Sequence, residues 1–239
     1  MLNLYPDTTR LTVYNEADVN STDENGRTAL MHAVMKGKNI EILQELLDSG
    51  ADVNATDKEY QTSLMLAALF NTNSDVMRLL IDNGADVNAV TREGWTPLMV
   101  IAWNKYSNIE HIRLLIDSGA DVNAAANTGW TPLSLAAKFN SNPDITLTLI
   151  ENGARVNVTH ENGWTPLMWA ARFNPCPDVL RLLIENGADV SIKNKKGQMA
   201  IKYANRNNAL RGTDEYNLLY SATQGLRPTT YSKGKNKAR

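Results

Sequence analysis

The chain has 239 residues, of which 43% are hydrophobic and 21% are charged, and its mean hydropathy is −0.35. These values fit one or two folded domains, and no stretch approaches the roughly 18 consecutive apolar residues of a transmembrane helix. The single cysteine, Cys176, excludes a disulfide or a thiolate metal cluster within these residues. The first residues lack the pattern of a signal peptide, so we expect a cytoplasmic protein.

The net charge of −2 hides an uneven distribution of charges along the chain. Residues 221–239 carry five basic side chains and no acidic one, which leaves 19 basic and 26 acidic side chains, a charge of −7, for residues 1–220. The last residues are also polar and poor in apolar side chains. We therefore predict that residues 222–239 form a basic, disordered tail.

The first predicted element is a helix over residues 6–14. It begins with Pro6, ten residues before the sequence Glu-Ala-Asp-Val-Asn that starts at Glu16. The same spacing separates Pro143 from a related sequence that starts at Gly153. We interpret this helix as the second helix of an incomplete repeat, so that residues 1–15 form a half-repeat cap at the N-terminal end of an array.

From residue 16 onward the chain repeats a unit of 34 or 35 residues. The sequence Gly-Ala-Asp-Val-Asn or a close variant begins each unit, at Glu16, Gly50, Gly84, Gly119, Gly153 and Gly187. Twelve residues after each start comes Thr-Pro-Leu or a variant, at Thr28, Thr62, Thr96, Thr131, Thr165 and a degenerate Met199. Six matches in register predict six structural repeats over residues 16–221.

Each unit predicts two helices and a polar turn. The Thr is a good N-cap, and the Pro that often follows it fits the first helical turn. Small residues such as Ala136 and Ala137 let the first helices approach one another, whereas the second helix is rich in Leu and Ile and ends at the next Gly. Residues 213–220 predict a capped final helix with a more polar outer face.

This unit resembles the ankyrin repeat, and the resemblance covers residues 6–220. It implies an all-α solenoid of helix-turn-helix units joined by β-hairpin-like turns. Two departures stand out: the unit is one residue longer, between its two helices, and a position that is commonly His in the family holds another residue. That position is occupied by Met31, Met65, Met99, Ser134 and Met168.

No group of residues predicts catalysis or a bound cofactor. His32, His111 and His160 fall in three different repeats, so stacking would not bring them together as a metal site. Cys176 lies between two prolines with no His nearby in sequence, and no phosphate-binding glycine motif is present. The carboxylates that recur with the repeat indicate a role in the turn; these are Asp52, Asp86, Asp121 and Asp189. We therefore expect no enzyme, metal or cofactor.

The tryptophans point to a binding surface. Trp95, Trp130 and Trp164 each stand immediately before the N-capping Thr. The resemblance implies that this turn, together with the positions seven and eight residues after the Thr, lines a concave surface that commonly binds a partner. Trp169 falls on the same side of its helix as Phe173, four residues later. The predicted partner-binding residues are Phe70, Arg92, Trp95, Trp103, Trp130, Lys138, Phe139, Trp164, Trp169, Arg172 and Phe173.

The resemblance implies a non-enzymatic protein-binding module, a scaffold, adaptor or inhibitor that is monomeric on its own. A structural alternative is that Trp95, Trp130 and Trp164 stack on one another and stiffen the array, which is compatible with binding. A nucleic-acid-binding protein could use the aromatic stripe and the basic tail, although the acidic body opposes this. A third possibility is a regulatory subunit of an enzyme.

Overall fold

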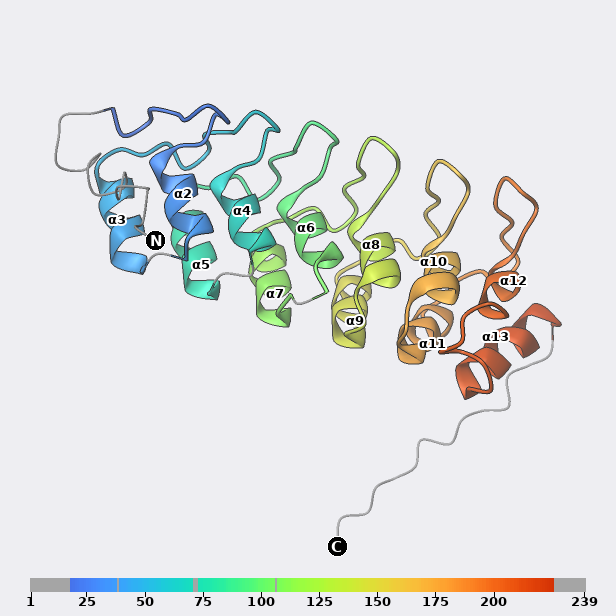
Figure 1. Cartoon of the computed structure of the whole chain (residues 1–239). Coiled ribbons are helices and arrows are strands. Elements are labelled where there is room, and N and C mark those ends of the chain that lie inside the picture. Colours follow the sequence, from blue (N-terminus) through green and yellow to red (C-terminus); the bar gives the residue numbers. More distant parts are fainter. Residues whose placement is uncertain (1–17, 38, 71–72, 106, 226–239) are drawn as a thin grey trace, which may run out of the picture.

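A computed structural model describes residues 18–37, 39–70, 73–105 and 107–225 of the chain. Within these residues the chain forms twelve helices and no strand. Figure 1 shows two rows of helices that run side by side along the molecule, with long turns projecting from one edge. The all-α solenoid expected from the sequence is confirmed.

The first helix of each repeat lies in one row, which we call the inner row, and the second helix lies in the outer row (Figure 1). The inner row consists of α2 (Ala29–Met35), α4 (Ser63–Leu69), α6 (Pro97–Trp103), α8 (Pro132–Phe139), α10 (Pro166–Phe173) and α12 (Ala200–Ala204). The outer row consists of α3 (Ile40–Asp48), α5 (Ser74–Asp82), α7 (Ile109–Asp117), α9 (Pro143–Glu151) and α11 (Pro177–Glu185). The last helix, α13 (Asp214–Thr223), packs against α11 and α12.

The ends of the described chain refine the predicted boundaries. The N-cap of α13 is Thr213, whose side chain accepts a hydrogen bond from the backbone of Tyr216, as the sequence suggested. The helix continues to Thr223, so residues 222–223 are helical and do not belong to the predicted tail. The predicted helix over residues 6–14 and the chain from residue 226 onward lie outside the described residues.

Threonine side chains start the inner helices. The hydroxyl of Thr165 accepts a hydrogen bond from the backbone N–H of Met168 at 3.3 Å, and four other inner helices begin in the same way. This contact satisfies a backbone donor that has no partner inside the helix. In α12 the equivalent residue is Met199, which makes no side-chain cap, and this helix has only five residues.

The methionines that replace the family's common histidine lie in the hydrophobic core. Met31, Met65, Met99 and Met168 are each no more than 2% exposed. The fourth repeat has Ser134 at this position, and its hydroxyl accepts from the backbone N–H of Thr131 while Thr131 caps Ser134 in return. The departure from the family pattern therefore strengthens apolar packing in four repeats and capping in one.

The long turns, which we call fingers, are β-hairpin-like. In the fifth finger the N–H of His160 donates to the carbonyl of Trp164 at 2.9 Å, and each of the other five fingers has the equivalent bond. Successive fingers are also bonded to each other, as where Lys195 N–H donates to the Asn162 carbonyl. Gly163 has φ +74°, and a Cβ there would lie 3.0 Å from the Lys195 nitrogen, so glycine permits this close approach.

Asparagine side chains join one repeat to the next. Asn54 donates to the carbonyl of Gly84 at 2.9 Å and accepts from the backbone N–H of Asp86 at 2.8 Å. Equivalent links involve Asn20, Asn88, Asn123 and Asn157. The recurring aspartates accept from the backbone two residues later, as Asp86 does from Asn88, which confirms their role in the turn.

Candidate interaction surface

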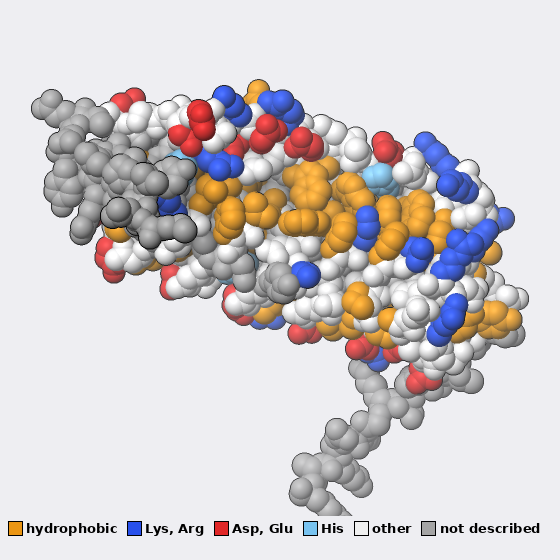
Figure 2. All heavy atoms as spheres, in the orientation of Figure 1, with side chains coloured by type: hydrophobic (Ala, Val, Ile, Leu, Met, Phe, Trp, Pro, Cys, Tyr) orange, Lys and Arg blue, Asp and Glu red, His pale blue; other side chains and the backbone are white. Residues whose placement is uncertain are grey.

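The inner row and the bases of the fingers form one face of the molecule, which we call the inner surface. Figure 2 shows this face, where a band of hydrophobic side chains runs along the array below the fingers. Acidic side chains appear mostly along the upper and lower margins, and Lys and Arg gather toward the C-terminal end. The band contains most of the residues that the sequence predicted as partner-binding.

Eight aromatic rings make a continuous series of contacts along this band, which we call the aromatic row. The ring centroids of Trp95 and Trp103 are 6.3 Å apart, and those of Trp103 and Phe139 are 6.4 Å apart, both edge-on. Phe139 in turn lies 6.3 Å from Trp130. The row thus crosses from the third to the fourth repeat.

The C-terminal half of the row is packed more tightly. Trp169 lies between two indoles, with centroids 4.7 Å from Trp130 and 4.4 Å from Trp164. Trp164 then contacts Tyr203 of the sixth repeat at 4.3 Å, and Phe173 contacts both Trp164 and Trp169. Five rings from three repeats therefore form one cluster.

The direct stacking of the finger tryptophans suggested as an alternative is wrong in its detail. Among the described rings, no direct contact joins Trp95, Trp130 and Trp164. Rings from the inner helices intervene: Trp103 and Phe139 link Trp95 to Trp130, and Trp169 links Trp130 to Trp164. The aromatic row is thus both a structural element and part of the surface.

Exposure differs along the row. Trp169 and Tyr203 are buried, and the three finger tryptophans are half-buried. Trp103, Phe139 and Phe173 remain 40%, 38% and 47% exposed, at the ends of the inner helices. Large rings held in place by neighbours and open to solvent on one side are typical of contact surfaces.

The ammonium group of Lys138 lies among four rings of the row. Its Nζ is 4.4 Å from the ring centroid of Phe139, 4.5 Å from Trp169, 5.0 Å from Trp130 and 5.2 Å from Phe173. Burial lowers the pKa of this amine. The rings stabilise the charged form through cation–π contacts, so the side chain is held as a fixed cation at the centre of the surface.

The other predicted residues lie at different distances from this centre. Arg172 has its guanidinium carbon 5.2 Å from the Phe173 ring, next to the cluster. Arg92 lies on a finger, 5.6 Å above the ring of Tyr60, and donates to the Lys58 carbonyl, so it supports the neighbouring finger. Phe70 is exposed at the end of α4 and makes no ring contact with the described aromatic residues.

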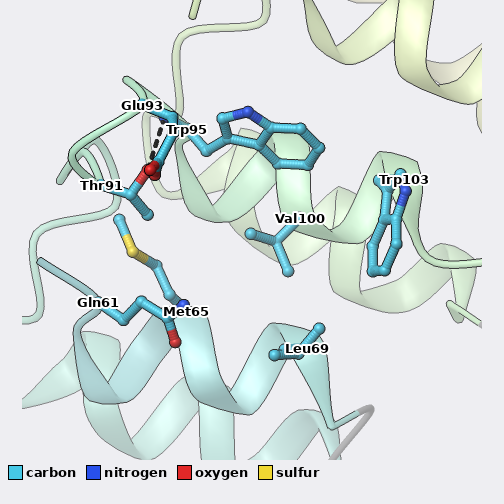
Figure 3. Close-up of a pocket in the computed structure, with 8 residues that line it drawn as sticks. All are labelled: Gln61, Met65, Leu69, Thr91, Glu93, Trp95, Val100 and Trp103. Atoms are coloured by element: carbon cyan, nitrogen blue, oxygen red, sulfur yellow. Dashed lines mark hydrogen bonds between the residues drawn. The ribbon is translucent and has the colours of Figure 1, made fainter. Parts of the chain in front are cut away.

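An apolar pocket opens at the N-terminal end of the aromatic row, between the second and third repeats. Figure 3 shows Met65 and Leu69 of α4 on one side, with Val100 and Trp103 of α6 and the indole of Trp95 on the other. Gln61, Thr91 and Glu93 complete the lining, and the cavity volume is about 350 Å³. The Thr91 hydroxyl donates to Glu93 at 3.2 Å, which orients this carboxylate within its own finger.

Sequence reasoning missed three contributors to this surface. Tyr203 stands 34 residues after Trp169, so the repeat register could have found it; its hydroxyl donates to Gln198 at 2.6 Å and accepts from Asn194. Val100 occupies the same register position in the third repeat and leaves the pocket open. The ring of His160 lies 4.8 Å from that of Trp130, and no sequence pattern marked this contact.

The three histidines and Cys176 do not form a common site. His32 is hydrogen bonded to Asp23, and burial lowers the pKa values of His111 and His160. Cys176 occupies the N-cap position of α11 without a side-chain cap. Among the described residues, no three His, Cys, Asp or Glu side chains come together as metal ligands. The described helices also include none that is long and apolar enough to cross a membrane.

Comparison with known families agrees with this architecture. A model of ankyrin repeats in three copies matches residues 2–91, 31–126, 64–160 and 124–194. The chain therefore belongs to the ankyrin repeat family, whose repeats are in general protein–protein interaction modules. No curated protein matches the chain.

Proposed function

We propose that this chain is a non-enzymatic binding protein that holds a protein partner against its inner surface, as a scaffold, adaptor or inhibitor. The observation that carries the proposal is the aromatic row, in which exposed Trp103, Phe139 and Phe173 are held by rings behind them. Rigid aromatic side chains bury a large area at a low cost in conformational entropy, and tryptophan is enriched among binding hot spots.

The exposed rings give a better test than Trp130 and Trp164, because the half-buried indoles also support their neighbours. Phe139→Ser with Phe173→Ser removes two exposed rings while leaving the contacts of Trp169 with Trp130 and Trp164 in place. We expect this variant to remain folded, as its thermal unfolding checks, and to lose at least about tenfold in partner affinity.

The partner and the face are identified together by photocrosslinking in the native host cell. A photoreactive phenylalanine analogue replaces Phe139 in one variant and Arg113, exposed on the outer helix α7, in the other. We expect a protein adduct from position 139 and not from position 113. Adducts from position 113 alone would contradict the proposed binding face.

A further inference from the structure

The repeats differ in how their junctions on the inner surface are filled. The pocket between the second and third repeats is bordered by Gln61 and Val100. Between the fourth and fifth repeats the residues at the same register positions are Trp130 and Trp169, whose rings contact at 4.7 Å and occupy that space. The open junction is therefore a position where the chain itself supplies no large side chain.

The pocket is apolar and of limited size. Met65, Leu69, Val100, Trp95 and Trp103 provide most of its lining, with Gln61, Thr91 and Glu93 adding polar groups. Its volume of about 350 Å³ lies at the lower end of the range of about 300–1,000 Å³ for sites that hold whole small ligands. A single large aliphatic or aromatic side chain suits this space, as Trp169 does in the filled junction.

Basic side chains follow the pocket in chain order. The position seven residues after each N-cap holds Met35, Leu69 and Trp103 in the first three repeats. In the last three repeats it holds Lys138, Arg172 and Arg206, and Lys202 adds another cation on α12. The inner surface thus changes from apolar to basic along its length, as Figure 2 shows at its C-terminal end.

The cations of the inner surface differ from those of the outer row in their partners. Outer-row Arg113 and Arg181 each pair with a carboxylate three residues earlier on the same helix. In the part of the chain that the structure describes, none of Lys138, Arg172 and Arg206 forms an ion pair. The inner helices carry no Asp or Glu.

Lys138 is best placed to receive an anion. Four rings fix its ammonium group and exclude part of the water that surrounds it. A carboxylate that approaches a partly desolvated cation gains more than it would beside a fully hydrated one. Arg172 lies over the same Phe173 ring as Lys138 and can bind a second carboxylate through its planar guanidinium group.

We infer that the inner surface binds one segment of an acidic polypeptide. This segment inserts a large apolar side chain into the apolar pocket between the second and third repeats and places carboxylates on Lys138 and Arg172. This inference rests on the proposed function and adds the partner's chemistry and its direction along the array. The apolar anchor lies at the second and third repeats, and the acidic part lies over the fourth to sixth.

The charges elsewhere on the molecule favour a polypeptide over a nucleic acid. The outer helices α3, α5, α7, α9 and α11 carry eleven acidic and three basic residues. The fingers at the pocket end bear Glu59 and Glu93, which would repel the evenly spaced phosphates of a nucleic acid but would face the apolar part of the inferred segment. The indoles are also packed against each other, which leaves little free ring face for bases to stack on.

The test begins with a phage-displayed library of random 12-residue peptides selected on the full chain. We expect the enriched peptides to share one Leu, Ile, Phe or Trp on one side of two or more Asp or Glu residues. Synthetic copies of the most enriched peptide, and a copy with Asn and Gln in place of Asp and Glu, are then titrated by fluorescence anisotropy.

Two variants probe the two parts of the inferred site. Val100→Trp places in the third repeat the residue type found at the same position in the fifth, so the backbone accommodates it; we expect at least about tenfold weaker peptide binding. Lys138→Met with Arg172→Met keeps the side-chain length near the rings and removes both charges. We expect about tenfold weaker binding at low salt and a smaller difference at 0.5 M salt.

Matched controls separate this inference from the proposed function. Arg113→Met removes a paired outer cation and is expected to leave the affinity unchanged, and the thermal unfolding temperature of each variant checks its fold. Basic or wholly polar peptides, no enrichment, or peptides that bind Val100→Trp normally would overturn the inference.

The remaining outcomes are also distinct. If peptides of another chemistry still lose affinity in Phe139→Ser with Phe173→Ser, the proposed function stands and only the partner chemistry is wrong. If the peptides crosslink to the outer row, both proposals fail. A labelled 12-nucleotide single strand is tested in competition with the peptide. If it competes, and if its binding is weakened by Lys138→Met with Arg172→Met but not by Val100→Trp, the surface binds nucleic acid instead.

Discussion

The inner and outer helix rows of this protein are built from the same repeat but differ in charge, in ion pairing and in the exposure of aromatic rings. The outer helices from α3 to α11 carry eleven acidic and three basic residues, and two of those arginines pair with a neighbour on the same helix. The inner helices carry three basic residues, no acidic residue, and three of the six exposed aromatic rings among the described residues.

This difference is what the proposed binding face predicts. Acidic side chains on the outer row keep that face hydrated and separate it from other copies of the molecule. The inner row instead leaves large rings partly open to solvent and cations without acidic partners, an arrangement typical of a contact surface. Substitutions should therefore have unequal effects in the two rows.

The largest effect on stability is expected in the inner row at Trp169. Its buried indole contacts Trp130, Trp164 and Phe173, so Trp169→Ala should leave a cavity and lower the free energy of unfolding by about 4 kcal/mol. Half-buried Ile184 of α11 gives the outer-row comparison, for which Ile184→Ala should cost about 1 kcal/mol. Urea unfolding followed by circular dichroism measures both; equal losses would contradict the comparison.

Buried asparagines at the ends of the inner helices come next. Asn174 donates to the carbonyls of Ala137 and Asn140 and accepts from Cys176, so Asn174→Ala should cost about 3 kcal/mol. Asn186 makes a single exposed bond to the Leu182 carbonyl at the end of an outer helix, and Asn186→Ala should cost about 0.5 kcal/mol. Chemical denaturation measures the free energy of unfolding of both variants. A larger loss in Asn186→Ala than in Asn174→Ala would contradict the comparison.

The helix starts give a smaller contrast within the fifth repeat. Thr165 caps the inner helix α10, so Thr165→Ala should lower stability by about 1 kcal/mol. Cys176 begins the outer helix α11 without a side-chain hydrogen bond, and Cys176→Ala should cost less, about 0.5 kcal/mol. A thermal scan of both variants resolves the order, and a reversed order would show that the thiol contributes more through packing than the hydroxyl does through capping.

The smallest effect concerns pH and the outer-row residue His111. Burial lowers its pKa in the folded state, with partial opposition from Glu110, so the folded chain resists protonation. As pH falls below about 6.5, the unfolded chain binds the proton instead, and stability is lost. Val76 and Val179 hold the same place in α5 and α11, which makes His111→Val a conservative replacement.

The His111→Val variant is expected to gain stability relative to the parent chain as pH falls from 7.5 to 5. Part of the acid sensitivity should persist, because burial and the charge of Lys138 also lower the pKa of His160 in the inner surface. Urea midpoints at several pH values test this. A constant difference between the two proteins would show that His111 does not take part in the acid response.

Much of this architecture could be predicted because one register repeats six times. The Thr caps, the closing glycines and the turn aspartates are local features, and each depends on a few adjacent residues. The four buried methionines also occupy the same position in each of their repeats. These features were predicted without knowing which side chains contact each other between repeats.

The details of the binding surface depend on side-chain packing between repeats, which the sequence pattern does not specify. The positions of Trp95, Trp130 and Trp164 suggested a direct stack, but rings of the inner helices, among them Phe139 and Trp169, come between them. The pocket arises where Val100 is too small to fill the junction. Tyr203, by contrast, could have been predicted, because it occupies the same repeat position as Trp169.

The asparagine links have a consequence for how such an array changes its length. Asn54 contacts Gly84 and Asp86 through the same atoms that Asn88 uses toward Gly119 and Asp121. Loss of residues 85–119 would therefore bring Ala120 next to Gly84 and leave Asn54 with chemically identical acceptors and donors. The fold can lengthen or shorten by whole units without a new kind of joint, while the side chains at the Gln61 and Val100 positions decide whether a junction on the inner surface is open or filled.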